Sequence, residues 1–360
     1  MGTTDATGVV RPGEIMTAEI DEQPHVLARL WTEQAGEIRQ IADELARRRH
    51  RFVLLAARGT SDHAALYAKY LVEVQQALPA GLVSPSTSTI YGVRPDLRGV
   101  LHISVSQSGG SPDLVDALEA ARSCGATTVA VTNNVASDLA RAAEFVVDVR
   151  AGSERAVAAT KSYTAELLAL YLLLGADLSA RDARSGAARL ADAAQATLQG
   201  VDAVGAAAAR YRFATSLVTT ARGYSYATAR EAALKLMETT YLGAQAFSAA
   251  DLLHGPLAMI DQNTPVIAVA TPGRGGAAMT SVLRTLHERH ADLVVVGGTD
   301  DAAAAAPSAS VLRVQTEGIP EELHPVLDIL PLQQLALRLA LERGVNPDAP
   351  RGLRKVTETW

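Results

Sequence analysis

Apolar positions along the chain follow two patterns, short uninterrupted runs and longer segments with helical spacing. From Met16 to Leu45 apolar residues recur every three or four positions, which predicts helix, and Pro24 predicts a break or a new start within it. Further helices are predicted at 64–76 and 114–124, and apolar runs predict strands at 52–57, 82–84, 100–105, 128–132 and 145–149. This alternation predicts a parallel sheet with helices on both faces.

The same pattern recurs in the second half of the chain. The run Ser216–Ala221 leads into Arg222-Gly223, as Phe52–Ala57 leads into Arg58-Gly59, and further strands are predicted at 266–270 and 293–297. We therefore expect two tandem α/β halves. The predicted divisions are a lead and helix (1–45), a first domain (46–200), a second domain (201–342) and an irregular tail (343–360), with a low-complexity loop at 302–306.

Composition and charge narrow the class of protein. The chain has 360 residues, of which 48% are hydrophobic, enough for two cores. Its net charge of −6 comes from 33 basic and 39 acidic residues that are interspersed, so no nucleic-acid partner is expected. Cys124 is the single cysteine, and the eight histidines lack ligand spacing, so neither a disulfide nor a metal site is predicted. With no signal-like or membrane-length apolar run, we expect a cytoplasmic protein.

The richest local motif is Ser106-Gln107-Ser108-Gly109-Gly110-Ser111, between a predicted strand and a predicted helix. Its glycines let backbone N–H groups approach a ligand, the helix contributes the positive end of its dipole, and the serines donate hydrogen bonds. This segment, the serine loop (106–111), predicts a phosphate cradle built without positive charge. The alternative is an ordinary capped helix start, for which Ser111 and Asp113 would suffice.

A second constellation lies in the helical segment from Glu231 to Glu238. Helical spacing places Glu231, Lys235 and Glu238 on one side, at i, i+4 and i+7. A carboxylate beside an ammonium can serve as a base, whereas the alternative is a solvated surface stripe of ion pairs.

Two further candidate catalytic residues, His254 and Lys355, lie nearer the end of the chain. His254 precedes Gly255-Pro256, a loop where an imidazole could meet a ligand or merely cap a turn. Lys355 in the tail is solvated unless the tail folds back over the site, where its amine could form an imine.

Together these segments resemble the sugar isomerase (SIS) family, in particular the isomerase half of glutamine:fructose-6-phosphate aminotransferase and the stand-alone amino-sugar-phosphate deaminases and isomerases. The resemblance extends from Met16 to the end of the chain. It is carried by Arg58-Gly59-Thr60-Ser61, the serine loop, 157–162, the Glu231–Glu238 helix, His254-Gly255-Pro256-Leu257 and the Lys355 tail. It implies two tandem doubly wound, flavodoxin-like subdomains and no cofactor.

The resemblance also implies roles for individual residues. Glu238 would carry a proton between sugar carbons 1 and 2, supported by Glu231 and Lys235. His254 would assist ring opening from a second subunit, which implies a homodimer with shared sites, and Lys355 would form or lie near an imine. The phosphate and nearby sugar atoms would be held by Gly59, Thr60, Ser61, Ser106, Gln107, Ser108, Gly109, Ser111, Val157 and Ala158.

Departures from the family pattern shape the expected activity. Gly2 stands where a glutamine-hydrolysing domain would place a cysteine, so a self-contained glutamine aminotransferase is not expected. Gly110 replaces a glutamate, and Gly243 and Gln245 replace histidine and glutamate. We expect deamination and isomerisation of glucosamine 6-phosphate to fructose 6-phosphate and ammonia. The alternatives are a lyase that dehydrates N-acetylglucosamine 6-phosphate and a sugar-phosphate sensor without turnover.

Overall fold

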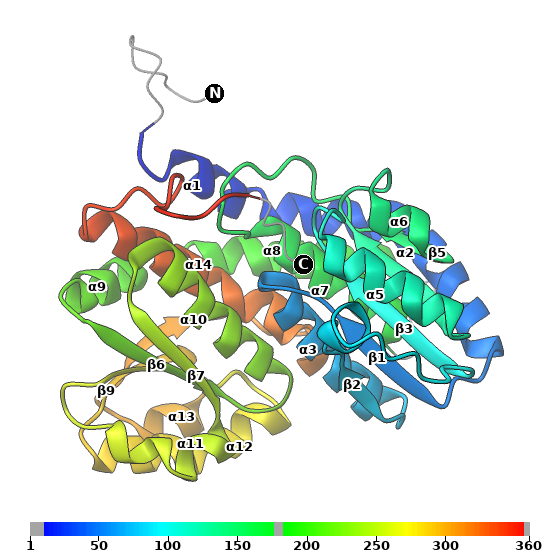
Figure 1. Cartoon of the computed structure of the whole chain (residues 1–360). Helices are drawn as coiled ribbons and strands as arrows, with labels where there is room; N and C mark the ends of the chain where they lie inside the picture. Colours follow the sequence, from blue (N-terminus) through cyan, green and yellow to red (C-terminus); the bar gives the residue numbers. More distant parts are fainter. Residues whose placement is uncertain (1–10, 176–182, 356–360) are drawn as a thin grey trace.

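The computed structural model describes residues 11–175 and 183–355, and these contain two five-stranded parallel sheets (Figure 1). The first sheet has the order β2-β1-β3-β4-β5. Its strands are β1 (Phe52–Ala56), β2 (Ala80–Leu82), β3 (Val100–Val105), β4 (Thr127–Thr132) and β5 (Phe145–Asp148). Every residue of β3 is buried, as expected for a central strand covered on both faces.

The second sheet repeats this arrangement, with the order β10-β9-β8-β6-β7. Its strands are β6 (Ser216–Ala221), β7 (Gly243–Ser248), β8 (Pro265–Val269), β9 (Asp292–Gly297) and β10 (Ser310–Arg313). In each sheet the first strand lies between the next two in sequence, so the strand order reverses beside it. That reversal is the switch point at which doubly wound sheets bind ligands, and the predicted tandem fold is confirmed.

Helices surround and separate the two sheets (Figure 1). In the first half they are α1 (Glu14–Asp21), α2 (Gln23–Arg47), α3 (Thr60–Gln75), α4 (Ser86–Thr89), α5 (Pro112–Ser123), α6 (Asp138–Ala142) and α7 (Lys161–Leu174). The rest are α8 (Ala183–Leu198), α9 (Val201–Tyr211), α10 (Tyr226–Thr240), α11 (Ala249–Leu253), α12 (Arg274–Glu288), α13 (Asp300–Ala305) and α14 (His324–Glu342). Pro24 lies in the first turn of α2, so the predicted break is confirmed.

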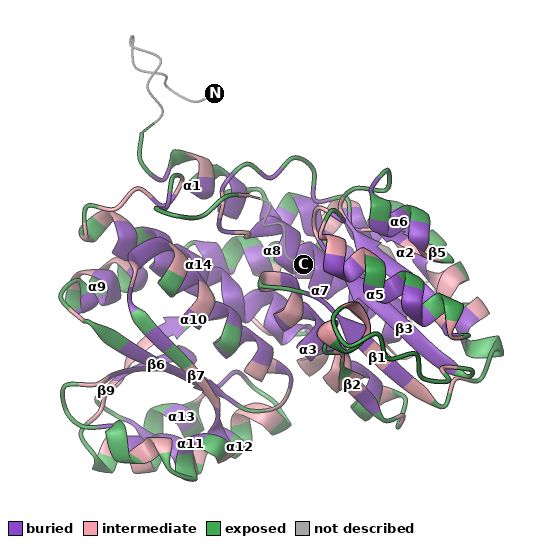
Figure 2. Cartoon of the chain, viewed as in Figure 1, coloured by how far each residue is buried: buried purple, intermediate pink, exposed green. Residues whose placement is uncertain are grey.

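The largest core lies between the sheets and joins the two halves. Helix α7 is buried along its whole length and α14 along most of it (Figure 2). Helix α3 of the first half packs against α7 and against α10 of the second half. This contact brings the switch point of the first sheet next to a helix of the second domain.

Three local predictions need correction. The segment predicted as a loop at 302–306 largely belongs to helix α13, because Thr299 Oγ1 accepts a hydrogen bond from the Ala302 N–H and caps the helix. The helix predicted from residue 64 begins at Thr60, so Thr60 and Ser61 lie in its first turn. The strand predicted at 82–84 lies at Ala80–Leu82.

The tail folds back across the molecule. From Arg343 to Lys355 it contains no helix or strand, as predicted, and the Asp348 carboxylate accepts the N–H groups of Ile15 and Met16. Residues 1–10 of the predicted lead, residues 176–182 and the chain end (356–360) lie outside the described residues. Among the described helices, none combines the length and apolarity needed to cross a membrane.

The second half carries its own anion at its switch point. Glu321, just before α14, accepts the backbone N–H groups of Arg274 (2.9 Å) and Gly275 (2.7 Å) in the first turn of α12. The carboxylate thus occupies the positive end of that helix dipole.

Candidate active site

A cavity of about 380 Å³ opens at the carboxyl ends of β1 and β3. Its walls come from the start of α3, the serine loop, the segment before α7, helix α10 and the tail. The lining residues are Arg58, Gly59, Thr60, Ser61, Ser106, Gln107, Ser108, Ser111, Leu114, Val157, Ala159, Ser162, Glu238, Leu353, Arg354 and Lys355. Segments almost 300 residues apart in sequence therefore converge on the ligand position expected for this fold.

The serine loop is shaped to present donors. Ser106 Oγ accepts the Gly109 N–H (3.2 Å) and Ser108 Oγ accepts the Gly110 N–H (3.3 Å). Gly109 has φ +62°, and a Cβ there would lie 2.1 Å from Ser137 Oγ, so only glycine fits. Ser111 precedes α5 but makes no capping hydrogen bond through its side chain. Capping therefore does not account for the Ser111 hydroxyl.

Cationic side chains also line the cavity, contrary to the predicted cradle without positive charge. The Arg58 guanidinium lies 2.6 Å from the carboxylate of Asp113, in the first turn of α5. Arg354 and Lys355 approach from the tail. Phosphate groups are commonly held by such a combination of helix dipole, N–H groups and cations.

Helix α10 brings a buried ion cluster to the cavity wall. Lys235 Nζ lies 2.5 Å from Glu238 and 3.3 Å from Glu231, and it donates to Thr60 Oγ1 (3.0 Å). Burial alone would lower the pKa of Lys235, but the two carboxylates outweigh it and raise the pKa. Glu231 also contacts His63 Nδ1 (2.7 Å). The reading as a surface stripe is wrong, because Glu231 and Lys235 are fully buried.

Glu238 is the member of this cluster that reaches the cavity. Its side chain is 21% exposed, while Glu231 and Lys235 lie behind it. A partly exposed carboxylate on a rigid helix can exchange a proton with a bound ligand, provided the ligand fits the cavity.

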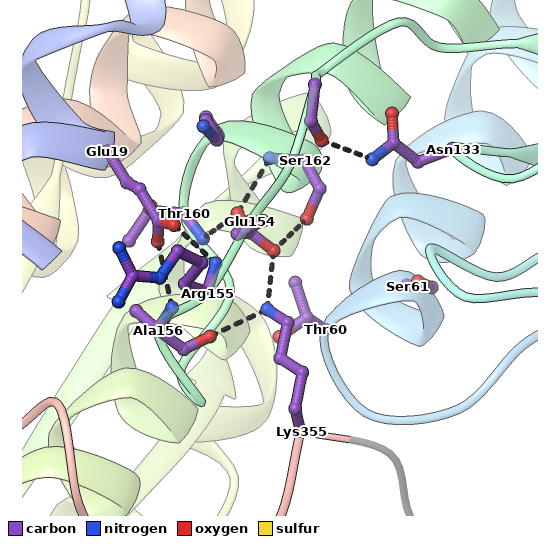
Figure 3. Close-up of polar contacts among 12 residues, drawn as sticks. Glu19, Thr60, Ser61, Asn133, Glu154, Arg155, Ala156, Thr160, Ser162 and Lys355 are labelled. Atoms are coloured by element: carbon purple, nitrogen blue, oxygen red, sulfur yellow. Dashed lines mark hydrogen bonds and ion pairs between the residues drawn. The ribbon is translucent and has the colours of Figure 1, made fainter. Parts of the chain in front are cut away.

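The tail is attached through Glu154, which Figure 3 shows beside Lys355. Glu154 Oε1 accepts the N–H groups of Thr160 and Ser162 (3.0 Å each), at the start of α7. Oε2 accepts the Ser162 hydroxyl (2.7 Å) and Lys355 Nζ (2.7 Å), and Lys355 also donates to the Ala156 carbonyl (2.7 Å). Burial raises the pKa of Glu154, but Lys355 and the other donors outweigh it, so the pKa is lowered.

Helix α1 braces the segment that precedes α7. The Glu19 carboxylate accepts the backbone N–H groups of Arg155 and Ala156 (Figure 3). Next to them Val157 and Ala159 line the cavity, whereas Ala158 is fully buried and does not.

The cavity brings together most of the residues singled out from the sequence, but not all. Gly109 is buried within the serine loop, and His254 is exposed after α11; neither lines this chain's cavity. Gly243 and Gln245 lie on β7 and do not line the cavity either. The sequence predicted no ligand-binding role for Glu154, which holds Lys355, or for six residues that line the cavity: Arg58, Leu114, Ala159, Ser162, Leu353 and Arg354. Of these, Arg58 was visible beside Gly59-Thr60-Ser61 and repeated as Arg222.

A comparison with protein families matches the SIS domain model twice, over residues 44–176 and 211–343. The chain belongs to the SIS family. It is 33% identical over 343 residues to the glutamine:fructose-6-phosphate aminotransferase of Methanothermobacter thermautotrophicus, covering 94% of this chain and 56% of that protein. The chain thus spans about half the length of that relative.

Solved structures agree with the fold. A candidate phosphosugar isomerase from Silicibacter pomeroyi is 31% identical, with a TM-score of 0.79 over 94% of this chain and 100% of that one. Glucosamine-6-phosphate deaminase from Thermotoga maritima superposes with a TM-score of 0.76, covering 96% of this chain and 99% of that one. At 19% identity, this likeness shows the fold alone.

Proposed function

We propose that this SIS protein is an amino-sugar-phosphate enzyme that converts glucosamine 6-phosphate to fructose 6-phosphate and ammonia. One observation carries the proposal: the hydroxyls of the serine loop and the carboxylate of Glu238 line the same cavity. A phosphate held at one end would present the sugar carbons to a base at the other.

Binding and chemistry are separated within the cavity. Ser106, Ser108 and Ser111, with the N-terminus of α5 and Arg58, would hold the phosphate, whose binding energy orders a flexible open-chain sugar. The Lys235 ammonium, 2.5 Å from Glu238, supplies the countercharge for the base.

The reaction would need one proton transfer and one hydrolysis. Glu238 removes the proton from carbon 2 of the open-chain aldehyde and returns it to carbon 1, which leaves a ketimine at carbon 2. Water adds to the ketimine, and ammonia leaves as the ketone of fructose 6-phosphate forms. Lys355 Nζ, held by Glu154, would lie beside the carbon skeleton, where an imine with the keto sugar could form.

The test is product analysis with the full chain. Incubation with glucosamine 6-phosphate should release ammonia and fructose 6-phosphate in equal amounts, and Glu238→Gln should abolish turnover while retaining ligand binding. Glu288→Gln, an exposed carboxylate at the end of α12, is the matched control and should behave as the parent. A folded parent protein that releases no ammonia refutes the deaminase proposal.

The same experiment separates the alternatives. Loss of water from N-acetylglucosamine 6-phosphate, seen by mass spectrometry, would indicate the lyase. Binding of both sugars without any product would indicate the sensor.

We also propose that His254 serves the cavity of a second subunit, because it is exposed and lies outside its own chain's cavity lining. Mixing inactive Glu238→Gln and His254→Ala proteins should restore activity, since a mixed dimer would hold one intact site. Mixed dimers that form without any activity would refute shared sites.

A further inference from the structure

Two buried carboxylates near the start of α7 have opposite surroundings. Glu154 accepts hydrogen bonds from two backbone N–H groups, a hydroxyl and the Lys355 ammonium. Glu166 is 1% exposed, and its Oε1 lies 3.0 Å from Ser61 Oγ, while its Oε2 has no hydrogen-bond partner. Ser61 in turn lines the cavity. Glu166 is therefore one hydroxyl away from the proposed phosphate position.

The groups that face Glu166 disfavour its ionised form. Burial is the main cause that raises its pKa well above the usual value, and the carboxylates of Glu154 and Glu231 raise it further. The Ser61 hydroxyl from α3 and the more distant Lys355 ammonium oppose this without reversing it. On its own helix the neighbouring titratable group is the buried Tyr163 phenol, which carries no charge.

We infer that Glu166 is a positioning residue which, as a neutral carboxylic acid, donates its proton to Ser61 Oγ and so turns the Ser61 hydroxyl into a donor toward the ligand. This rests on the proposed phosphate binding. Glu166 itself would not touch the ligand, but it would decide whether Ser61, which does, donates or accepts a hydrogen bond there.

A hydroxyl has a single hydrogen, so Ser61 can donate only one hydrogen bond at a time. An ionised Glu166 could only accept that hydrogen, and Ser61 would then offer lone pairs to an anionic phosphate. A protonated Glu166 reverses the direction, so Ser61 accepts from Glu166 and donates into the cavity. The neutral acid also avoids placing an uncompensated charge in a buried site.

Binding of glucitol 6-phosphate, an open-chain sugar phosphate without a carbonyl, tests this without turnover. Glu166→Gln keeps a donor to Ser61 and should bind within about twofold of the parent at neutral pH. Glu166→Leu removes the donor and should raise Kd about three- to tenfold, the value of one hydrogen bond. In a Ser61→Ala background, Glu166→Leu should not change Kd further. In a turnover assay, Glu166→Leu alone should change kcat less than KM.

An infrared spectrum reads the protonation state directly. The parent should show the carbonyl band of a buried carboxylic acid at neutral pH, and Glu166→Gln should lose it. A missing band, or a Glu166→Gln protein that binds more than fivefold tighter, would mean an ionised Glu166 and would overturn the inference. A parent that binds no sugar phosphate would instead refute the proposed function, and with it the role of Ser61.

Discussion

Replacing Glu154 with glutamine should release the tail from the cavity while leaving the start of α7 intact. The two oxygens of Glu154 have separate partners, since Oε1 accepts the N–H groups of Thr160 and Ser162 and Oε2 accepts Lys355 Nζ. A glutamine can keep its oxygen at the first position. Its NH₂ group then faces the Lys355 ammonium, and two donors meet.

The contact between Glu154 and Lys355 sets how much free energy of tail docking the substitution removes. A hydrogen bond to a charged group contributes about 1.5–3 kcal/mol, and the 25% exposure of the Lys355 side chain places this pair toward the lower end. A loss of about 1.5–2 kcal/mol lowers the ratio of docked to released tail by about ten- to thirtyfold. Because the pKa of Glu154 is lowered in the fold, its contribution is present above the usual carboxyl pKa and is lost as the pH falls through the folded value.

Limited trypsin digestion reports the released tail, because the backbone at Arg354, which is already exposed, can enter a protease only when the segment around it is no longer held through Lys355. Glu154→Gln and Lys355→Met should each speed cleavage at Arg354, and the double variant should be cleaved no faster than either. Such non-additivity is the sign of a direct contact. Additive rates, or an unchanged rate in Glu154→Gln, would refute the reasoning.

Three further outcomes follow from described contacts. Lys235→Met leaves two carboxylates without their ammonium and should cost about 3–5 kcal/mol of unfolding free energy in urea; a loss under 1 kcal/mol contradicts this. Ser111→Ala should raise KM about three- to tenfold with unfolding free energy unchanged within about 0.5 kcal/mol, since no cap is lost. Burial raises the pKa of Asp328 to about 7, so stability should fall by about 4 kcal/mol as the pH rises from about 4 to above 7, and Asp328→Asn should remove this slope in denaturation curves.

Strands of the two sheet centres could be predicted from the sequence because both of their faces are buried. The runs that form β3 and β6 are almost continuously apolar or small. Strand β7, Gly-Ala-Gln-Ala-Phe-Ser, lies at a sheet edge and has no such run, so it was not predicted. Helix α14 was also missed, because a helix buried on all sides lacks a polar face and therefore lacks the periodic signal.

Some features of the candidate site could likewise be predicted from the sequence and others could not. The serine loop and the Glu231–Glu238 spacing are local, and each could be read from a few consecutive residues. The partners of Glu154 and Glu166 are not local, since Lys355 is 201 residues from Glu154 and Ser61 is 105 residues from Glu166. A single glutamate in an apolar helix gives no sign of the hydroxyl or ammonium that the fold brings to it.

The carboxylate of Glu321 at the start of α12 makes the two halves unequal. Both repeats place a helix N-terminus at a strand-order reversal, yet the second has an acidic side chain of its own seated there. That carboxylate ties the second repeat to the segment leading into α14 and fills the place that the serine loop of the first repeat leaves open to the cavity.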